Sequence, residues 1–121
     1  MRLKVLPYLL TVAKYERVPE GLTGFYSLSA TDREISLVCE SDRLPPCCVA
    51  REDGWRALMV EGPLDFSLVG ILADLASVLA AAKVPLFALS TYDTDYLLVK
   101  ERDLDRTLSA LRGAAYEVVE R

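Results

Sequence analysis

The sequence predicts an α+β fold in which strands and helices alternate along the C-terminal half of the chain. Residues 67–83 carry apolar side chains at helical spacing, and residues 84–100 contain two strand-like runs around a short polar turn. A second amphipathic helical pattern covers residues 101–113. With strands predicted at residues 55–61 and 116–120, the order is βαββαβ, which is typical of a ferredoxin-like plait.

The predicted helix at residues 67–83 is apolar around nearly its whole circumference. Ser67 is the expected N-cap, because its hydroxyl can accept a hydrogen bond from one of the first backbone N–H groups. One face carries Ile71, Leu75, Val78, Leu79 and Ala82, and the other carries Ala73, Ala76, Ala80 and Ala81. A surface helix normally has a charged outer face. We therefore expect this helix to be covered on both sides, by its own sheet and by another helix or subunit, and we expect a homodimer.

The N-terminal half predicts mainly strands. Residues 3–14 read as one or two strands broken near Pro7, and residues 25–29 and 34–40 read as a hairpin. The segment between them, residues 15–24, is rich in turn-forming residues and too short for a packing helix.

The two predicted hairpins resemble each other. Residues 24–44 align with residues 85–105 without a gap at an offset of 61 positions, and seven pairs are identical, among them Leu28 with Leu89 and Asp32 with Asp93. This similarity favours an internal duplication, although two hairpins that share ordinary strand chemistry remain the alternative. We therefore predict two tandem repeats, a degenerate one at residues 1–50 and a complete one at residues 55–121, separated by a proline-containing loop.

Composition excludes several classes of function. The net charge is −4, with 14 basic and 18 acidic residues, which argues against binding to nucleic acid. No apolar run is long enough to span a membrane, and the N-terminus lacks the pattern of a signal peptide, so a cytoplasmic location is expected.

Little in the sequence indicates catalysis. The chain has no histidine, and Cys39, Cys47 and Cys48 lack the spacing of a zinc site. Asp93 and Asp95 are two positions apart, but such a pair at a hairpin is more often turn chemistry than an acid–base pair. We therefore expect no enzymatic activity, no metal and no cofactor.

Binding of a small polar ligand fits the pattern better. The start of a helix offers unpaired N–H groups and a partial positive charge, which suit a carboxylate, and Gly70 would let a ligand approach the backbone. Asp95 provides a negative charge for an ammonium or guanidinium group. The alternative is that Gly70 only permits close packing of the helix.

The stretch from Glu61 to Lys100, with EGPLDF, GIL and LAAAKVPLFALSTYDTDYLLV, resembles the ACT domain, and more distantly the arginine-sensor proteins that contain it. The resemblance covers residues 55–120 well and the N-terminal half more loosely. It implies a module that binds an amino acid at an interface between ACT units, without catalysis. The ligand-binding positions that it implies are Ser67, Leu68, Val69, Gly70, Ile71, Thr91, Tyr92 and Asp95.

The chain departs from the common ACT pattern at two of these positions. The pattern has an acidic residue three positions before the glycine and a proline directly before it, whereas this chain has Ser67 and Val69. The usual partner of the ligand's ammonium group is therefore missing. Two functions remain open: an amino-acid-binding regulatory protein, or a structural subunit that regulates an unknown protein partner without a ligand. A plait-fold enzyme is a third class with little support.

Overall fold

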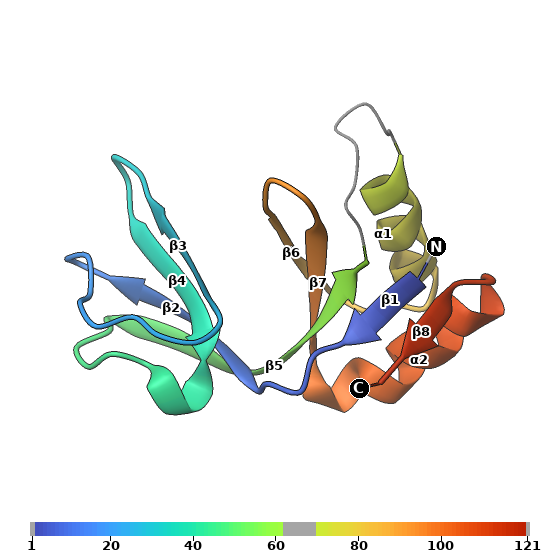
Figure 1. The fold of residues 1–121 in the computed structure, drawn as a ribbon, viewed down its shortest axis with the longest axis horizontal. Coiled ribbons are helices and arrows are strands. Elements are labelled where there is room, and N and C mark those ends of the chain that lie inside the picture. Colours follow the sequence, from blue (N-terminus) through green and yellow to red (C-terminus); the bar gives the residue numbers. More distant parts are fainter. Residues whose placement is uncertain (1, 62–69, 121) are drawn as a thin grey trace. The chain divides into compact units, whose positions relative to one another are not determined.

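The computed structural model describes residues 2–61 and 70–120 (Figure 1). The chain forms two compact units. One consists of Met1–Pro7 and Arg56–Arg121 and contains both α-helices, and we call it the α+β unit. The other is Tyr8–Trp55, which we call the β unit.

The described residues of the α+β unit form five strands in the order β6-β7-β5-β1-β8. They are β1 (Arg2–Val5), β5 (Ala50–Val60, of which the second half lies in this unit), β6 (Phe87–Ser90), β7 (Asp95–Lys100) and β8 (Glu117–Val119). β1 pairs antiparallel with β5 and parallel with β8. The α+β class predicted from the sequence is confirmed. The last strand of the plait, however, lies beside β1 rather than beside β5, because a strand from the start of the chain occupies that place (Figure 1).

Two helices, α1 (Ile71–Ala81) and α2 (Leu104–Gly113), bury apolar side chains in the core of the α+β unit. The predicted inner face of α1 is confirmed, since Leu75 and Leu79 are fully buried. A short 3₁₀ helix, η2 (Glu101–Asp103), precedes α2. The remaining core residues come from the strands and from the segment after α1: Leu3, Val5, Leu58, Val60, Val84, Leu97, Val99 and Val118, with Leu108 and Leu111 from α2.

The ends of the helices differ from the prediction. Ser67, the expected N-cap, lies outside the described residues. Gly70 is the N-cap of α1, with φ at 82°, and so does not lie inside the helix as predicted. Glycine is common just beyond the end of a helix, but Gly113 is the last residue of α2, and Ala115 adopts the left-handed conformation with φ at 71°. Glycine is the usual residue in that conformation, but Ala115 occupies it here.

The β unit contains β2 (Leu10–Tyr15), β3 (Tyr26–Ala30), β4 (Ile35–Glu40) and the first half of β5, in the order β3-β4-β2-β5. These neighbours all pair antiparallel. A second 3₁₀ helix, η1 (Ser41–Arg43), follows β4. One core cluster of this unit consists of Ala13, Tyr15, Leu37 and Cys39.

β5 begins five residues earlier than predicted, at Ala50 instead of Trp55. Its first half pairs with β2, with Val12 opposite Glu52 and Ala13 opposite Arg51. This half lies at the edge of the strand order of the β unit, where exposed polar side chains are compatible with a strand. A run of polar residues therefore indicated a loop where the structure has an edge strand.

The turns of the two hairpins have the same hydrogen bond, but the residues that correspond differ from those that the sequence alignment paired. The N–H of Thr31 bonds to the carbonyl of Glu34 at 2.9 Å, and the N–H of Thr91 bonds to the carbonyl of Thr94 at 2.9 Å. The corresponding residues are therefore Thr31 and Thr91, one position out of step with the sequence alignment. The matching burial patterns of β4 and β7 agree with this correspondence. The predicted offset is therefore wrong by one residue. Such a shift matters, because it reverses the face on which each strand side chain lies.

Candidate functional site

Five of the eight predicted ligand-binding residues are described, and all five belong to the α+β unit. They are Gly70 and Ile71 at the start of α1, and Thr91, Tyr92 and Asp95 at the turn between β6 and β7. Ser67, Leu68 and Val69 lie outside the described residues.

Gly70 leaves the start of α1 open. A Cβ atom built on this residue would have no described atom within 4 Å outside its immediate chain neighbours. The carbonyl of Gly70 accepts the first bond of the helix, from the N–H of Asp74 at 2.8 Å. The first N–H groups of a helix have no partner within it and can bind an anion. Ile71 itself is half-buried and packs against the core, so its side chain supports the helix rather than facing solvent.

The turn after β6 is exposed at its tip and fastened at its base. Tyr92 is 79% exposed. The hydroxyl of Thr91 donates to the carbonyl of Thr94 at 3.2 Å, and the hydroxyl of Thr94 in turn donates to the carbonyl of Val60, at the end of β5. The turn is therefore tied to the strand from which the chain leaves towards α1.

Asp95 is half-buried and begins β7. One of its carboxylate oxygens accepts a hydrogen bond of 2.5 Å from the hydroxyl of Ser90, the residue opposite it in the hairpin. Part of the hydrogen-bonding capacity of Asp95 is therefore used to close the turn. The start of α1 and the β6–β7 turn both project to the same side of the α+β unit (Figure 1).

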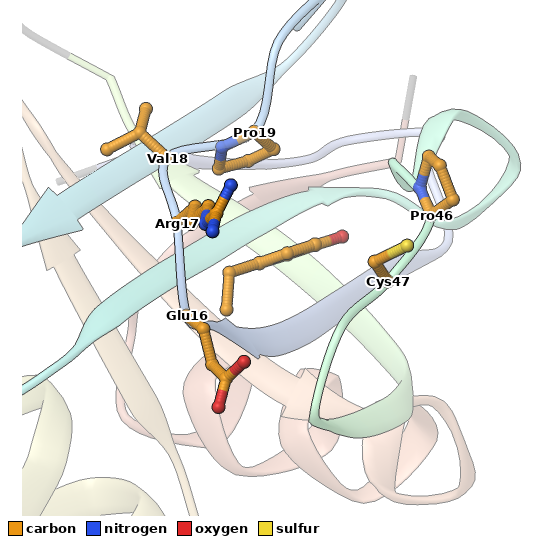
Figure 2. A pocket seen from close by; sticks show the side chains of 7 residues that line it. Glu16, Arg17, Val18, Pro19, Pro46 and Cys47 are labelled. Carbon is orange, nitrogen blue, oxygen red and sulfur yellow. The ribbon is translucent and has the colours of Figure 1, made fainter.

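The structure also has a feature that the sequence did not indicate, two hollows in the β unit that share lining residues. One, of about 350 Å³, is lined by Tyr15, Glu16, Arg17, Val18, Pro19, Pro46 and Cys47 (Figure 2). The other, of about 440 Å³, is lined by Lys14, Tyr15, Glu16, residues 31–35 and Val49. They share Tyr15 and Glu16, and we call them together the β-unit groove. Its lining comes from three segments that are distant in sequence, so no local motif could have indicated it.

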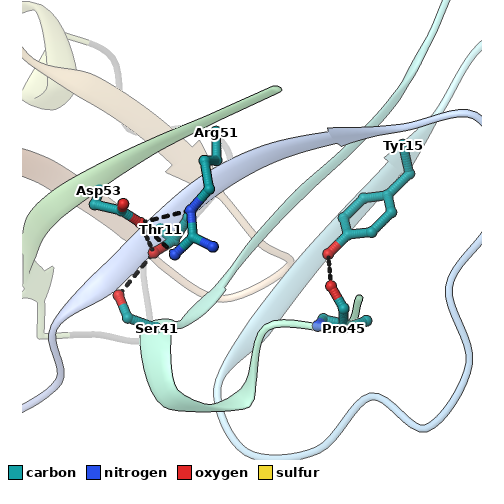
Figure 3. Close-up of polar contacts among 6 residues, drawn as sticks. All are labelled: Thr11, Tyr15, Ser41, Pro45, Arg51 and Asp53. Carbon is teal, nitrogen blue, oxygen red and sulfur yellow. Dashed lines mark hydrogen bonds and ion pairs between the residues drawn. The ribbon is translucent and has the colours of Figure 1, made fainter. Parts of the chain in front are cut away.

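Tyr15 lies at the base of this groove and is almost fully buried. Its hydroxyl donates to the carbonyl of Pro45 at 2.6 Å, which holds the loop after η1 against β2 (Figure 3). Burial raises the pKa of the Tyr15 hydroxyl, with a smaller contribution from the nearby thiol of Cys48. Burial also raises the pKa of the Cys39 thiol, so this cysteine is held in its uncharged form.

A second polar cluster of the β unit links three segments. Thr11 is fully buried, and its hydroxyl donates to the carboxylate of Asp53 and lies within hydrogen-bonding distance of the Ser41 hydroxyl, each at 2.7 Å (Figure 3). Arg51 donates to the same carboxylate at 2.8 Å, and this hydrogen bond raises the pKa of its guanidinium. The cluster joins β2, η1 and β5, which is a structural role.

The described residues around the α1 start and the groove form no group of metal ligands. Among the described residues, no three cysteine or carboxylate side chains are placed to hold a metal ion. In the described part of the chain, no helix is both long and apolar enough to cross a membrane.

Residues 50–113, more than half of the chain, match the ACT domain family. The chain is also 29% identical over 101 residues to subunit 1 of the human cytosolic arginine sensor for mTORC1. That similarity covers 78% of this chain but 30% of the sensor, so the chain spans about 30% of the length of the curated relatives it matches.

Solved structures share the fold of this chain. A crystal structure of an Agobacterium tumefaciens protein has a TM-score of 0.88 and 32% identity, and covers 99% of this chain and 92% of its own. The aspartate kinase of Clostridium acetobutylicum has a TM-score of 0.66 at 11% identity, covering 88% of this chain and 32% of its own, which shows a shared fold alone. Because the model of the ACT domain family matches more than half of the chain, this chain belongs to the ACT domain family.

Proposed function

We propose that this chain is a non-catalytic regulatory ACT protein that binds an amino acid in its α+β unit. The site would be formed by the start of α1, with Gly70 and Ile71, and by the turn residues Thr91, Tyr92 and Asp95. Ser67, Leu68 and Val69 would complete it. The chain's family membership supports the class of function, and the name of its relative, an arginine sensor, supports an amino acid as the ligand.

The observation that carries this proposal is the conformation of Gly70. It is left-handed, it precedes the first N–H groups of α1, which have no partner within the helix, and nothing described crowds the place of a Cβ atom. A ligand carboxylate can approach such a backbone closely, and the helix start favours a negative charge. The carboxylate of Asp95 would then face the ligand's cationic group from the turn.

We also propose that the chain works as a homodimer. On α1, Ala73, Ala80 and Ala81 are exposed in the single chain, and Ala76 is half-buried. A helix face of small side chains of this kind suits contact with a second copy, and ACT ligands usually lie at an interface between units. The relative's name describes it as cytosolic, which supports a cytoplasmic location for this chain as well.

The organisation that we propose is a tandem repeat, with a degenerate ACT-like repeat at residues 1–50 and a complete ACT domain at residues 55–121. The shared geometry of the two hairpin turns supports this. In this view β1 is a strand of the first repeat that now pairs with β5 and β8 of the second.

Thermal unfolding with each of the twenty amino acids in turn tests the ligand-binding proposal. A ligand at 100 times its Kd stabilises the folded state by about 2.7 kcal/mol, which gives a clear rise in Tm. L-arginine is the first choice for titration calorimetry. If no amino acid raises the Tm or gives a binding heat, the alternative is favoured: a structural ACT subunit that regulates a protein partner by contact.

A further inference from the structure

We infer that the β-unit groove is a second binding site, for a small zwitterion with an aliphatic portion, such as a free amino acid with an apolar side chain. This site lies in the β unit and is independent of the ligand proposed for the α+β unit. Hollows of about 350 and 440 Å³ are in the range of pockets that hold small molecules.

The charges around the groove are the first argument. Six charged side chains line it, three basic and three acidic: Lys14, Arg17, Arg33, Glu16, Asp32 and Glu34. Within the described part of the chain, none of these side chains takes part in an ion pair or a hydrogen bond. The other two arginines of the β unit both pair with carboxylates, Arg43 with Glu40 and Arg51 with Asp53. Among the residues of the β unit, all of which the structure describes, basic side chains without a partner therefore lie only around the groove, together with acidic ones.

The walls of the groove are held in place by hydrogen bonds. Tyr15 fastens the loop at Pro45, and the N–H of Val49 bonds to the carbonyl of Lys14 at 2.8 Å. In the turn, the Thr31 hydroxyl accepts from the N–H groups of Arg33 and Glu34, each at 3.1 Å. A site whose walls are already ordered loses less entropy when a ligand binds.

The chemistry of the lining selects the ligand class. Apolar side chains lie between the charges, with Val18, Pro19 and Pro46 in one hollow and Ile35 and Val49 in the other. Figure 2 shows residues 16–19 and the Pro46–Cys47 loop on opposite sides of the first hollow. A ligand with one cationic group, one carboxylate and an aliphatic stem can contact all three kinds of surface. A balanced set of charges disfavours a purely anionic or purely cationic ligand.

The test is an NMR titration of the isotope-labelled full chain with L-leucine, and in parallel with N-acetylleucine amide, which lacks both charges. We expect L-leucine to shift the amide signals of residues 15–18 and 31–35, and the uncharged analogue to leave them unchanged. Glu16→Gln and Arg33→Gln should each weaken L-leucine binding at least about tenfold, since each removes a charge-assisted hydrogen bond.

Glu20→Gln is the matched control, because Glu20 is an exposed carboxylate of the same segment that does not line the groove. Asp95→Asn separates the two sites, since it should not change the response of the groove. No shift up to the solubility limit of L-leucine, an equal response to the uncharged analogue, or wild-type binding by Glu16→Gln and Arg33→Gln would each overturn the inference.

Discussion

Ser90 donates a hydrogen bond of 2.5 Å to the carboxylate of Asp95 across the β6–β7 hairpin. Asp95 therefore has two roles in our proposal, since it closes the turn and also provides the charge for the ligand. Two variants separate these roles, Asp95→Asn and Ser90→Ala. Both weaken the hydrogen bond across the hairpin, but only Asp95→Asn removes the negative charge.

We expect Asp95→Asn to lower the affinity for the amino acid by about 10- to 150-fold, which corresponds to the loss of one charge-assisted hydrogen bond of about 1.5–3 kcal/mol. Ser90→Ala should bind nearly as the wild type does. Titration calorimetry with the amino acid found in the thermal screen measures both. Equal losses in the two variants would show that Asp95 acts through the turn and not through its charge.

Replacing Gly70 affects folding as well as binding. With φ at 82°, a valine at this position would be held in a left-handed conformation, so Gly70→Val should destabilise the protein by about 1–2 kcal/mol in urea unfolding. Gly113→Ala is the control, because Gly113 is helical and has open space around it. We expect that change to stabilise the protein by about 0.5–1 kcal/mol. Equal effects would argue against the left-handed start of α1.

The alanine face of α1 gives a prediction about assembly. Ala80→Glu would place an unpaired charge in the proposed dimer interface and should weaken the dimer by about 3–5 kcal/mol. Sedimentation equilibrium of the wild type and the variant measures this directly. Ser109→Glu, at an exposed position of α2, should leave the assembly unchanged. A wild-type protein that sediments as a monomer would contradict the proposal.

The Tyr116 hydroxyl donates to the carboxylate of Asp74, which raises the pKa of Tyr116 to about 12. Because the folded-state pKa lies above the ordinary value of 10, the stabilisation from this contact is fully present below about pH 10 and is lost as the pH rises towards 12. The difference between the ultraviolet titration curves of the wild type and of Tyr116→Phe isolates the ionisation of this tyrosine. Asp74→Asn should move its pKa back towards 10. An unchanged difference curve would mean that the contact does not form in solution.

Local patterns in the sequence determined much of the α+β unit. The spacing of Leu75 and Leu79 identified the buried face of α1, and the amphipathic pattern over residues 101–113 identified α2, which buries Leu108 and Leu111. The second of the two strand-like runs predicted within residues 84–100 ends where β7 ends, at Lys100. These features follow from the periodicity of side chains along a single element, which a sequence displays directly.

Only the tertiary structure decided which strands are neighbours. β1 lies between β5 and β8, and the first half of β5 extends back to Ala50 because β2 is available to pair with it. Backbone hydrogen bonds between distant segments set these arrangements, and such bonds carry no residue-specific signature. The offset between the hairpins was misread by one position for the same reason, since the bonds at Thr31 and Thr91 define the turn whereas the identities along the strands do not.

The candidate sites likewise depend partly on local sequence patterns and partly on the tertiary structure. The family motif indicated Gly70 and the β6–β7 turn, but the sequence could not reveal that Ser90 already bonds to Asp95, because that contact depends on strand register. The β-unit groove had no sequence signal at all. Its charges and apolar side chains come from the end of β2 and the segment after it, a hairpin turn and the loop before β5, and only the folded chain brings these segments together.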